Sequence, residues 1–178
     1  PSARAHSDGN EATAPATGGV WAEHSFWPQD PGLERAVAGG VTTLQALPGS
    51  ANLVGGRGVT LHLVPHRGAR AMRFPGAPDG LKMACGENPK RVYGKRSQAP
   101  STRMGNLRGQ RAIFMKAAEY RRQIEEAGDT PPARDLELET LVGAMEGRVL
   151  VHIHCYRADD MLNMLQLADE AGFKVRSF

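Results

Sequence analysis

Long apolar runs and a strong charge of either sign are both missing from this sequence. No window approaches the run of about 20 apolar residues that a membrane-spanning helix needs. Lysine and arginine total 22 and aspartate and glutamate total 19, so the net charge is only +3. We therefore expect no membrane span in this segment and no nucleic-acid partner. No targeting signal is visible in the sequence, and the compartment stays open.

Cysteine and the common nucleotide and serine-hydrolase motifs are also scarce or missing. The two cysteines, Cys85 and Cys155, exclude a disulfide framework, and no zinc-finger spacing of cysteine and histidine occurs. Each cysteine continues the helix-facing side of a strand-like run, so we predict small buried thiols rather than nucleophiles. The patterns GxxxxGKS/T, GxGxxG and GxSxG are absent, which leaves nucleotide binding and serine hydrolysis with little support.

Apolar residues make up 40% of the chain and are arranged in strand and helix patterns. From residue 81 onward, helices alternate with short apolar strands, which favours parallel strands joined by crossover helices. A doubly wound sheet and a (β/α)8 barrel both fit. We expect an irregular lead-in over 1–31, a loop over 86–106 and a run over 59–64 that is either a core strand or a hairpin arm. We expect parallel, adjacent strands over 41–47, 81–85, 149–155 and 174–178, and helices over 31–40, 106–127, 157–172 and after Asp135.

Two histidines share one face of the predicted strand VLVHIHC. Side chains alternate along a strand, so His152 and His154 point away from the face of Val151 and Ile153. Histidine is the commonest metal ligand in proteins. A single histidine here would be read as a hydrogen-bonded core residue, but two near the C-terminal end of a strand favour a functional site.

A lysine stands inside the short strand LKMACG. A buried cationic lysine is expensive unless it is paired or neutral, so Lys82 is either part of a site or the solvent-facing lysine of an edge strand. The sequence alone does not separate these two interpretations. Glu87, five residues later, is a candidate partner for the lysine.

Three phrases resemble one known family. AGGVTTLQALPGSANLVGG, LKMACGENPKRVYG and VHIHCYRADDML are similar to the amidohydrolase superfamily, and most closely to its imidazolonepropionase-like branch. The resemblance extends over about 20–178. It implies a (β/α)8 barrel with outer helices and a small β-sandwich. It also implies hydrolysis of C–N bonds, in amides or cyclic amides, by a metal-activated water.

The resemblance also implies roles for particular residues. Lys82 matches the strand-4 lysine, which is often carboxylated, and His154 matches the strand-5 histidine, so these two are the expected ligands of one or two divalent metals, zinc above all. His152 and Glu87 are secondary candidates. The substrate, a small amide, peptide-like or cyclic amide molecule, is expected to meet loop residues. These are Asn52, Asn88, Tyr156 and Arg157.

The sequence departs from the family pattern at several ligand positions. No HxH precedes GVTT, and the later histidine and aspartate ligands do not occur. We therefore expect 1–178 to be an internal fragment, roughly strands 2 to 6 of a partial barrel, inactive alone and completed by the remainder of its own barrel and the β-sandwich. The alternative is a non-catalytic α/β binding or scaffolding domain derived from the same fold. A basic nucleic-acid module is a remote third.

Overall fold

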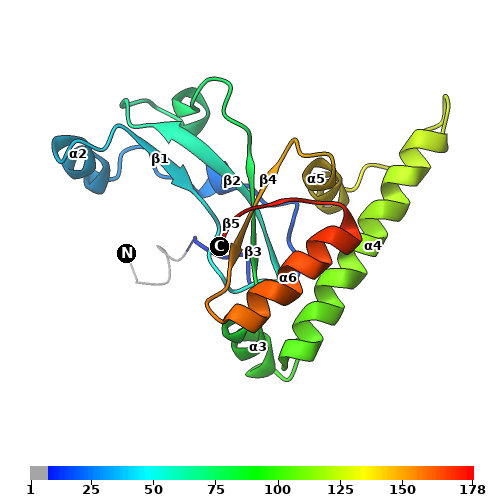
Figure 1. Cartoon of the computed structure of the whole chain (residues 1–178). Coiled ribbons are helices and arrows are strands. Elements are labelled where there is room, and N and C mark those ends of the chain that lie inside the picture. The colour runs from blue at the N-terminus through cyan, green and yellow to red at the C-terminus, as the bar shows by residue number, and fades with distance from the viewer. Residues whose placement is uncertain (1–7) are drawn as a thin grey trace.

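The computed structural model describes residues 8–178, and its central feature is one mixed sheet of five strands (Figure 1). The strands lie in the order β1-β2-β3-β4-β5. Their bounds are Thr43–Ala46, Val54–His62, Gly80–Ala84, Leu150–His154 and Val175–Ser177. The helices are α1 (Ala22–Ser25), α2 (Pro31–Ala38), α3 (Glu87–Gly94), α4 (Arg103–Glu126), α5 (Leu136–Met145) and α6 (Ala158–Ala171), with a 3-10 helix, η2, at Ala69–Met72.

The C-terminal half of the sheet is parallel. β3 pairs with β4 and β4 with β5 in parallel register. Helices fill both connections: α3, α4 and α5 lie between β3 and β4, and α6 lies between β4 and β5. α4 and α6 lie side by side against the same side of the strands (Figure 1). The prediction of parallel strands with outer helices is confirmed for this half.

The N-terminal half of the sheet is antiparallel, and here the prediction was wrong. β1 pairs antiparallel with β2, and β2 pairs antiparallel with β3, so β1 is not a neighbour of β3. The reason is the connection: only 47–53 separates β1 from β2, and so short a link cannot hold a crossover helix. The run at 59–64 therefore belongs to a hairpin arm.

The sheet is curled rather than flat. Neighbouring strands are spaced by about 4.8 Å, so a flat sheet would hold β1 and β4 roughly 14 Å apart. Yet the Nε2 atom of Gln45 on β1 lies 3.3 Å from Nε2 of His152 on β4. On the other side, Ser177 of β5 also reaches the His152 ring. The observed architecture is therefore an α/β fold with a curled, half-barrel mixed sheet, which is consistent with a partial barrel.

Glycine lets other parts of the chain approach β2 closely. The sequence placed the strand-like run at 59–64, but the strand begins at Val54. A Cβ at Gly56 would lie 2.5 Å from the carbonyl oxygen of Val20, and the φ angle there is +117°. A Cβ at Gly58 would lie 2.3 Å from a methyl group of Leu47. These glycines thus permit tight packing inside a strand. In the sequence, the same glycine-rich stretch is typical of a loop, so the start of the strand was missed.

The predicted lead-in at 1–31 contains more order than expected. Its residues 1–7 lie outside the part of the chain that the structure describes. From residue 8 on, it holds the one-turn helix α1 and runs beside β2: the amide of Thr17 donates to the Val54 carbonyl, and the amide of Arg57 donates to that of Val20. The lead-in is therefore attached to the sheet through its backbone.

Most predicted helices are confirmed, and their ends follow the expected signals. Asp135 caps α5, since its side chain accepts from the amides of Glu137 and Leu138 at 3.0 Å. Gly172 ends α6 in the left-handed conformation. Within residues 8–178, none of the helices is both long enough and apolar enough to cross a membrane.

One helix was missed. The segment GENPKRVYG was predicted as part of a loop, but Glu87–Gly94 forms α3. Its proline, Pro89, falls in the first helical turn, where an amide would have no intrahelical partner, so it does not interrupt the helix. Gly86, with a φ angle of +68°, supplies the turn from β3 into this helix.

The larger of the two apolar clusters among the described residues lies between the parallel strands and the helices, and the smaller one joins β2 to η2. Leu81 and Met83 of β3 and Val151 and Ile153 of β4 are fully buried against side chains from α4, α5 and α6. The two cysteines end this face and are buried as predicted. They are not separate thiols, however: Cys85 and Cys155 form a disulfide, with Cα atoms 5.4 Å apart.

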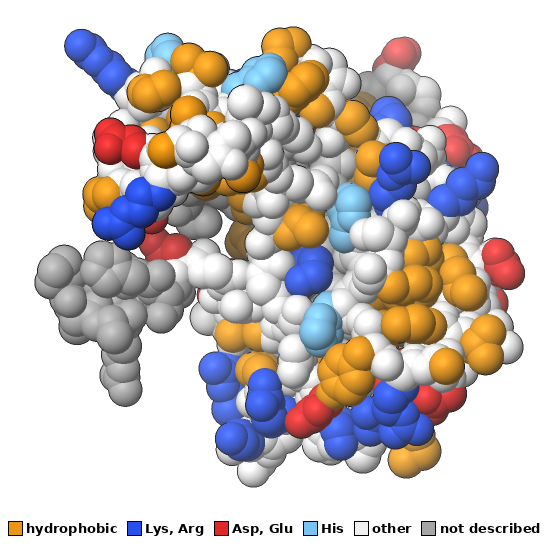
Figure 2. All heavy atoms as spheres, turned by 60° about the vertical axis from the view of Figure 1, so that its left-hand side comes forward, with side chains coloured by type: hydrophobic (Ala, Val, Ile, Leu, Met, Phe, Trp, Pro, Cys, Tyr) orange, Lys and Arg blue, Asp and Glu red, His pale blue; other side chains and the backbone are white. Residues whose placement is uncertain are grey.

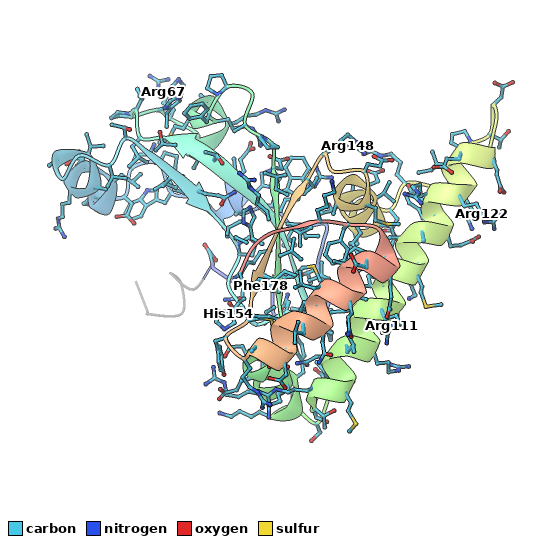
Figure 3. All side chains as sticks on the ribbon, in the orientation of Figure 1. Arg67, Arg111, Arg122, Arg148, His154 and Phe178 are labelled. Carbon is cyan, nitrogen blue, oxygen red and sulfur yellow. A yellow bond between two sulfur atoms is a disulfide. The ribbon has the colours of Figure 1, made fainter. Side chains whose placement is uncertain are left out.

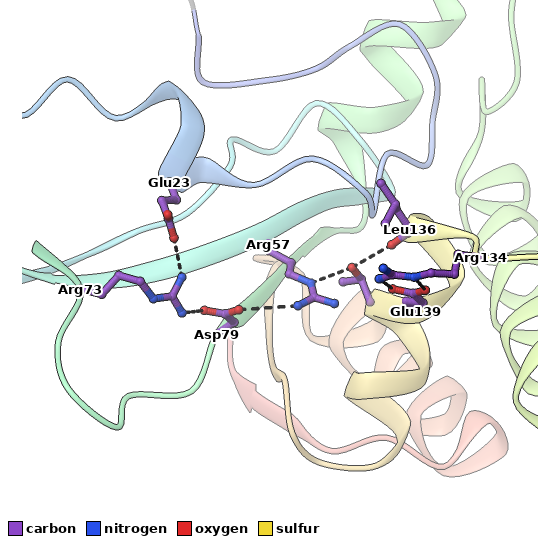
Figure 4. Close-up of polar contacts among 8 residues, drawn as sticks. Glu23, Arg57, Arg73, Asp79, Arg134, Leu136 and Glu139 are labelled. Atoms are coloured by element: carbon purple, nitrogen blue, oxygen red, sulfur yellow. Dashed lines mark hydrogen bonds and ion pairs between the residues drawn. The ribbon is translucent and has the colours of Figure 1, made fainter. Parts of the chain in front are cut away.

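A chain of ion pairs, ended by one hydrogen bond, links the N-terminal segment to α5 (Figure 4). Asp79 lies between Arg73, which donates a hydrogen bond to it, and Arg57, whose Nη1 is 3.6 Å away. Arg73 also pairs with buried Glu23, and Arg57 donates to the Thr140 hydroxyl at 2.8 Å. Each buried charge thus has a partner of opposite sign or a hydrogen bond, the condition under which burial is tolerated.

Candidate functional site

Three of the predicted site residues share one face of the sheet. Lys82 on β3 is the register partner of His152 on β4, and Ala84 is the partner of His154. Because side chains alternate, all three polar side chains point away from α4 and α6. The concave face that they occupy carries histidine and basic side chains together near its centre (Figure 2).

Lys82 lies in a central strand, between β2 and β4, which excludes the edge-strand interpretation. Its side chain is half-buried, and Nζ donates to the carbonyl oxygen of Pro48 and the hydroxyl of Ser50, both at 3.1 Å. Burial lowers the pKa of this ammonium group, because the charged form loses hydration. The lysine therefore loses its proton more readily than an exposed one.

His154 is the last residue of β4 (Figure 3). Its Nε2 atom is 3.2 Å from the amide nitrogen of Asn88 on α3, and the ring meets Tyr156 edge-on. Burial first, and then the positive charge of Lys82, lower the pKa of the imidazole. The neutral form, which carries the lone pair needed by a metal ligand or a base, is thus favoured.

His152 has hydrogen-bond partners at both ring nitrogens. Nδ1 lies 2.8 Å from the Ser177 hydroxyl, and Nε2 lies 3.3 Å from the Gln45 amide. Burial, Arg176 and Lys82, in that order, lower its pKa. This is the arrangement of a hydrogen-bonded interior histidine, and it leaves His152 the weaker ligand candidate of the two.

The secondary candidate Glu87 is not the partner of Lys82. Its carboxylate accepts a hydrogen bond from the Tyr156 hydroxyl, and no ion pair joins it to Lys82 among the described residues. The pKa of Glu87 is lowered, and the largest cause is this hydrogen bond from Tyr156. The contact joins the start of α3 to the loop after β4, beside His154.

The predicted substrate-loop residues separate into two groups. Asn88 and Tyr156 lie at His154, as described. Asn52 is 1% exposed, and its amide contacts the Thr17 hydroxyl, the Glu11 carbonyl and the Tyr93 hydroxyl, so it holds the loop rather than facing a ligand. Arg157 is exposed and paired with Asp159.

Several contacts at the site were not anticipated. Pro48 and Ser50 accept hydrogen bonds from the Lys82 ammonium group, and Gln45 and Ser177 are hydrogen-bonded to the His152 ring. The turn after β1 had the composition of a loop, and only the curl of the sheet brings it over β3. The one feature of the sequence that could have indicated these contacts is a polar residue inside a short strand, Gln45.

The described residues do not form a metal site by themselves. Among them, no group of three or more histidine, cysteine, aspartate or glutamate side chains could hold a metal ion. His154 supplies a neutral nitrogen, and Lys82 supplies an amine with a lowered pKa, so the two fit as ligands only within a larger set.

Comparison with known proteins gives two matches. No family model matches the chain. The amidohydrolase tasK of Hapsidospora irregularis is 35% identical over 198 aligned positions, which cover all of this chain and 20% of that protein. The crystal structure of an amidohydrolase from Thermotoga maritima MSB8 is 42% identical with a TM-score of 0.89, and the match covers 94% of this chain and 44% of that one.

The chain thus spans about a fifth of the length of the curated relative and less than half of the solved structure. The fold described above is the fold of the corresponding part of the Thermotoga protein. Over the segment that they share with this chain, both relatives support an amidohydrolase family.

Proposed function

We propose that this chain is a segment of a metal-dependent amidohydrolase of the imidazolonepropionase-like branch, one that hydrolyses C–N bonds in small amides, peptide-like amides or cyclic amides. The observation that carries the proposal is the shared face of Lys82 and His154 on neighbouring parallel strands, in a chain similar to two proteins named amidohydrolases. A bound divalent metal, zinc above all, would supply an activated water and polarise the substrate carbonyl.

Lys82 would contribute an oxygen ligand after carboxylation. The neutral amine adds to carbon dioxide and releases one proton, which leaves a carbamate anion in place of a buried cation. The lowered pKa of the lysine favours this reaction, because only the unprotonated amine is nucleophilic. Pro48 and Ser50 hold Nζ within the concave face.

His154 would contribute a ring nitrogen, and its neighbours would set the ring's orientation. Asn88 contacts Nε2, and Tyr156 packs edge-on against the ring. Substrate would enter past the loop after β4 and the start of α3, where Tyr156, Glu87 and Asn88 lie. The remaining ligands would come from the remainder of the barrel.

The test uses the natural full-length polypeptide. Zinc content would be measured by elemental analysis, and hydrolysis with a panel of simple and cyclic amides, for the wild type, Lys82→Ala and His154→Ala. The matched controls are Lys116→Ala on the exposed face of α4 and His66→Ala in an exposed loop. We expect both site variants to lose most metal and activity while they keep the native circular dichroism spectrum.

A carbamate on Lys82 would be detected separately, by a carbon-13 resonance after growth with labelled bicarbonate. Wild-type metal content in both site variants would overturn the ligand assignment. A metal-free, inactive wild type would favour the non-catalytic binding or scaffolding domain instead.

A further inference from the structure

The two cysteines meet at the ends of the strands that carry Lys82 and His154. Cys85 follows β3 and Cys155 follows β4, 70 positions apart in the sequence, and their Cα atoms are 5.4 Å apart. That separation lies within the range that a disulfide spans without backbone movement. No other pair of cysteines exists in this chain.

The fold holds both positions in place by contacts that do not involve sulfur. The amide of Cys85 donates to the carbonyl of His154 at 2.9 Å. On α4, the buried amides of Asn106 and Gln110 donate to the carbonyls of Gly86 and Ala84, on either side of Cys85, at 2.7 and 2.9 Å. The two side chains are therefore brought together by backbone pairing and by α4.

The sulfur atoms lie on the helix side of the sheet. Cys85 continues the face of Met83, and Cys155 continues that of Ile153, whereas Lys82 and His154 point to the other side. The cysteines thus adjoin the candidate ligands along the backbone, but they do not occupy the same space.

We propose that Cys85 and Cys155 form a redox-responsive site, whose oxidant is a low-molecular-weight disulfide and whose oxidised form ties the ends of β3 and β4 together. The Cys155 thiolate, at 9% exposure against 2% for Cys85, attacks the small disulfide and releases one small thiol. The Cys85 thiolate then attacks the Cys155 sulfur of the mixed disulfide and releases the second. The protein loses two electrons and two protons, and the small disulfide is reduced to two thiols.

Thermodynamic linkage makes the site testable. Folding brings the two thiols together, so it raises the equilibrium constant for forming the disulfide. By linkage, the disulfide raises the equilibrium constant for folding by the same factor. The disulfide should therefore form at a lower ratio of glutathione disulfide to squared glutathione in the folded protein than in the unfolded one.

The experiment equilibrates the natural full-length polypeptide in glutathione buffers of graded ratio, in native buffer and in concentrated guanidinium chloride, followed by acid quenching and tryptic mass mapping. The diagnostic product is the cross-link between the peptides 83–90 and 149–157. We expect its midpoint in native buffer to shift toward reducing conditions by at least about tenfold relative to the denatured chain.

Equal midpoints in the two solvents, or glutathione adducts without the cross-link in native buffer, would overturn the proposal. Cys155→Ser is the control for identity: it should leave Cys85 with a glutathione adduct at most. Because the decisive comparison uses wild-type protein, the result does not depend on whether that variant folds.

Discussion

The two faces of β3 and β4 have opposite physical characters. On the helix side, Leu81, Met83, Val151 and Ile153 are fully buried and wholly apolar. On the concave side, the same strands present Lys82, His152 and His154, which are half-buried and hydrogen-bonded to groups from β1, β5, α3 and the loop after β1. The first face stabilises the fold, whereas the second loses hydration without an anionic partner, the arrangement expected of a site rather than of a core.

The largest expected effect is on the apolar face. Leu81→Ala removes a fully buried side chain between β3 and the helices, and such truncations cost about 2–5 kcal/mol. We expect a loss of that size in the free energy of unfolding, measured by urea denaturation of the full-length polypeptide. Lys116→Ala, on the exposed side of α4, should change it by less than about 0.5 kcal/mol. A Leu81→Ala loss no larger than that of the control would show that this face is not the core.

The ion-pair chain shows what a partner does for a buried cation. Arg57, like Lys82, has a pKa lowered by burial, but it faces Asp79. Asp79→Asn removes the negative charge that serves both Arg57 and Arg73, so we expect it to cost about 2 kcal/mol in the free energy of unfolding. Urea denaturation would measure the loss, with Asp159→Asn at an exposed ion pair as the control. Equal effects of the two changes would contradict the comparison.

Lys82→Met tests the polar face, and it is compared with wild-type protein that is free of metal and carries an unmodified Lys82. The change removes two hydrogen bonds and also a poorly hydrated charge, and these effects oppose each other, so the free energy of unfolding should change by less than about 1 kcal/mol near neutral pH. The clearer signature is the dependence on pH. Because the lysine pKa is lowered from 10.5 in the folded chain, the unfolded chain binds more protons above that lowered value, and wild-type stability should rise with pH through that window up to about 10.5.

Lys82→Met should remove this alkaline rise, which denaturation midpoints over a series of pH values would detect. Lys116→Met should retain it. An unchanged alkaline rise in Lys82→Met would mean that another group is responsible.

The smallest expected effect is the titration of the histidines. His152 and His154 have pKa values lowered from 6.5, so protonation opposes the folded state. The free energy of unfolding should therefore be unaffected by these rings above about pH 6.5. It should decrease as the pH falls from 6.5 toward the lowered pKa values of the folded chain, because the unfolded chain binds more protons there. His152→Gln should weaken this acid-side decline, measured by denaturation midpoints, whereas His66→Gln should not. A steeper decline in His152→Gln would contradict the assigned direction.

Much of the parallel half was predictable because its signals are local. The strands around Lys82 and His154, the helix after Asp135 and the stop at Gly172 all follow from periodicity and capping, and each was confirmed within a few residues. The alternation of apolar and polar residues also assigned Lys82 and the histidines to one face. In contrast, α3 was missed because its proline and polar residues are equally typical of a loop.

By itself, the sequence determined the apolar helix-facing side of β3 and β4, the helix ends and the common face of the candidate ligands, because alternation and capping act over a few residues. Only the tertiary structure decided the antiparallel hairpin of β1 and β2, the reach of Gln45 to His152, the placement of Pro48 and Ser50 over Lys82, and the meeting of Cys85 with Cys155. These contacts join residues that are 32 to 107 positions apart, or neighbours across a turn. They depend on the direction and curl of the strands, which no local pattern encodes.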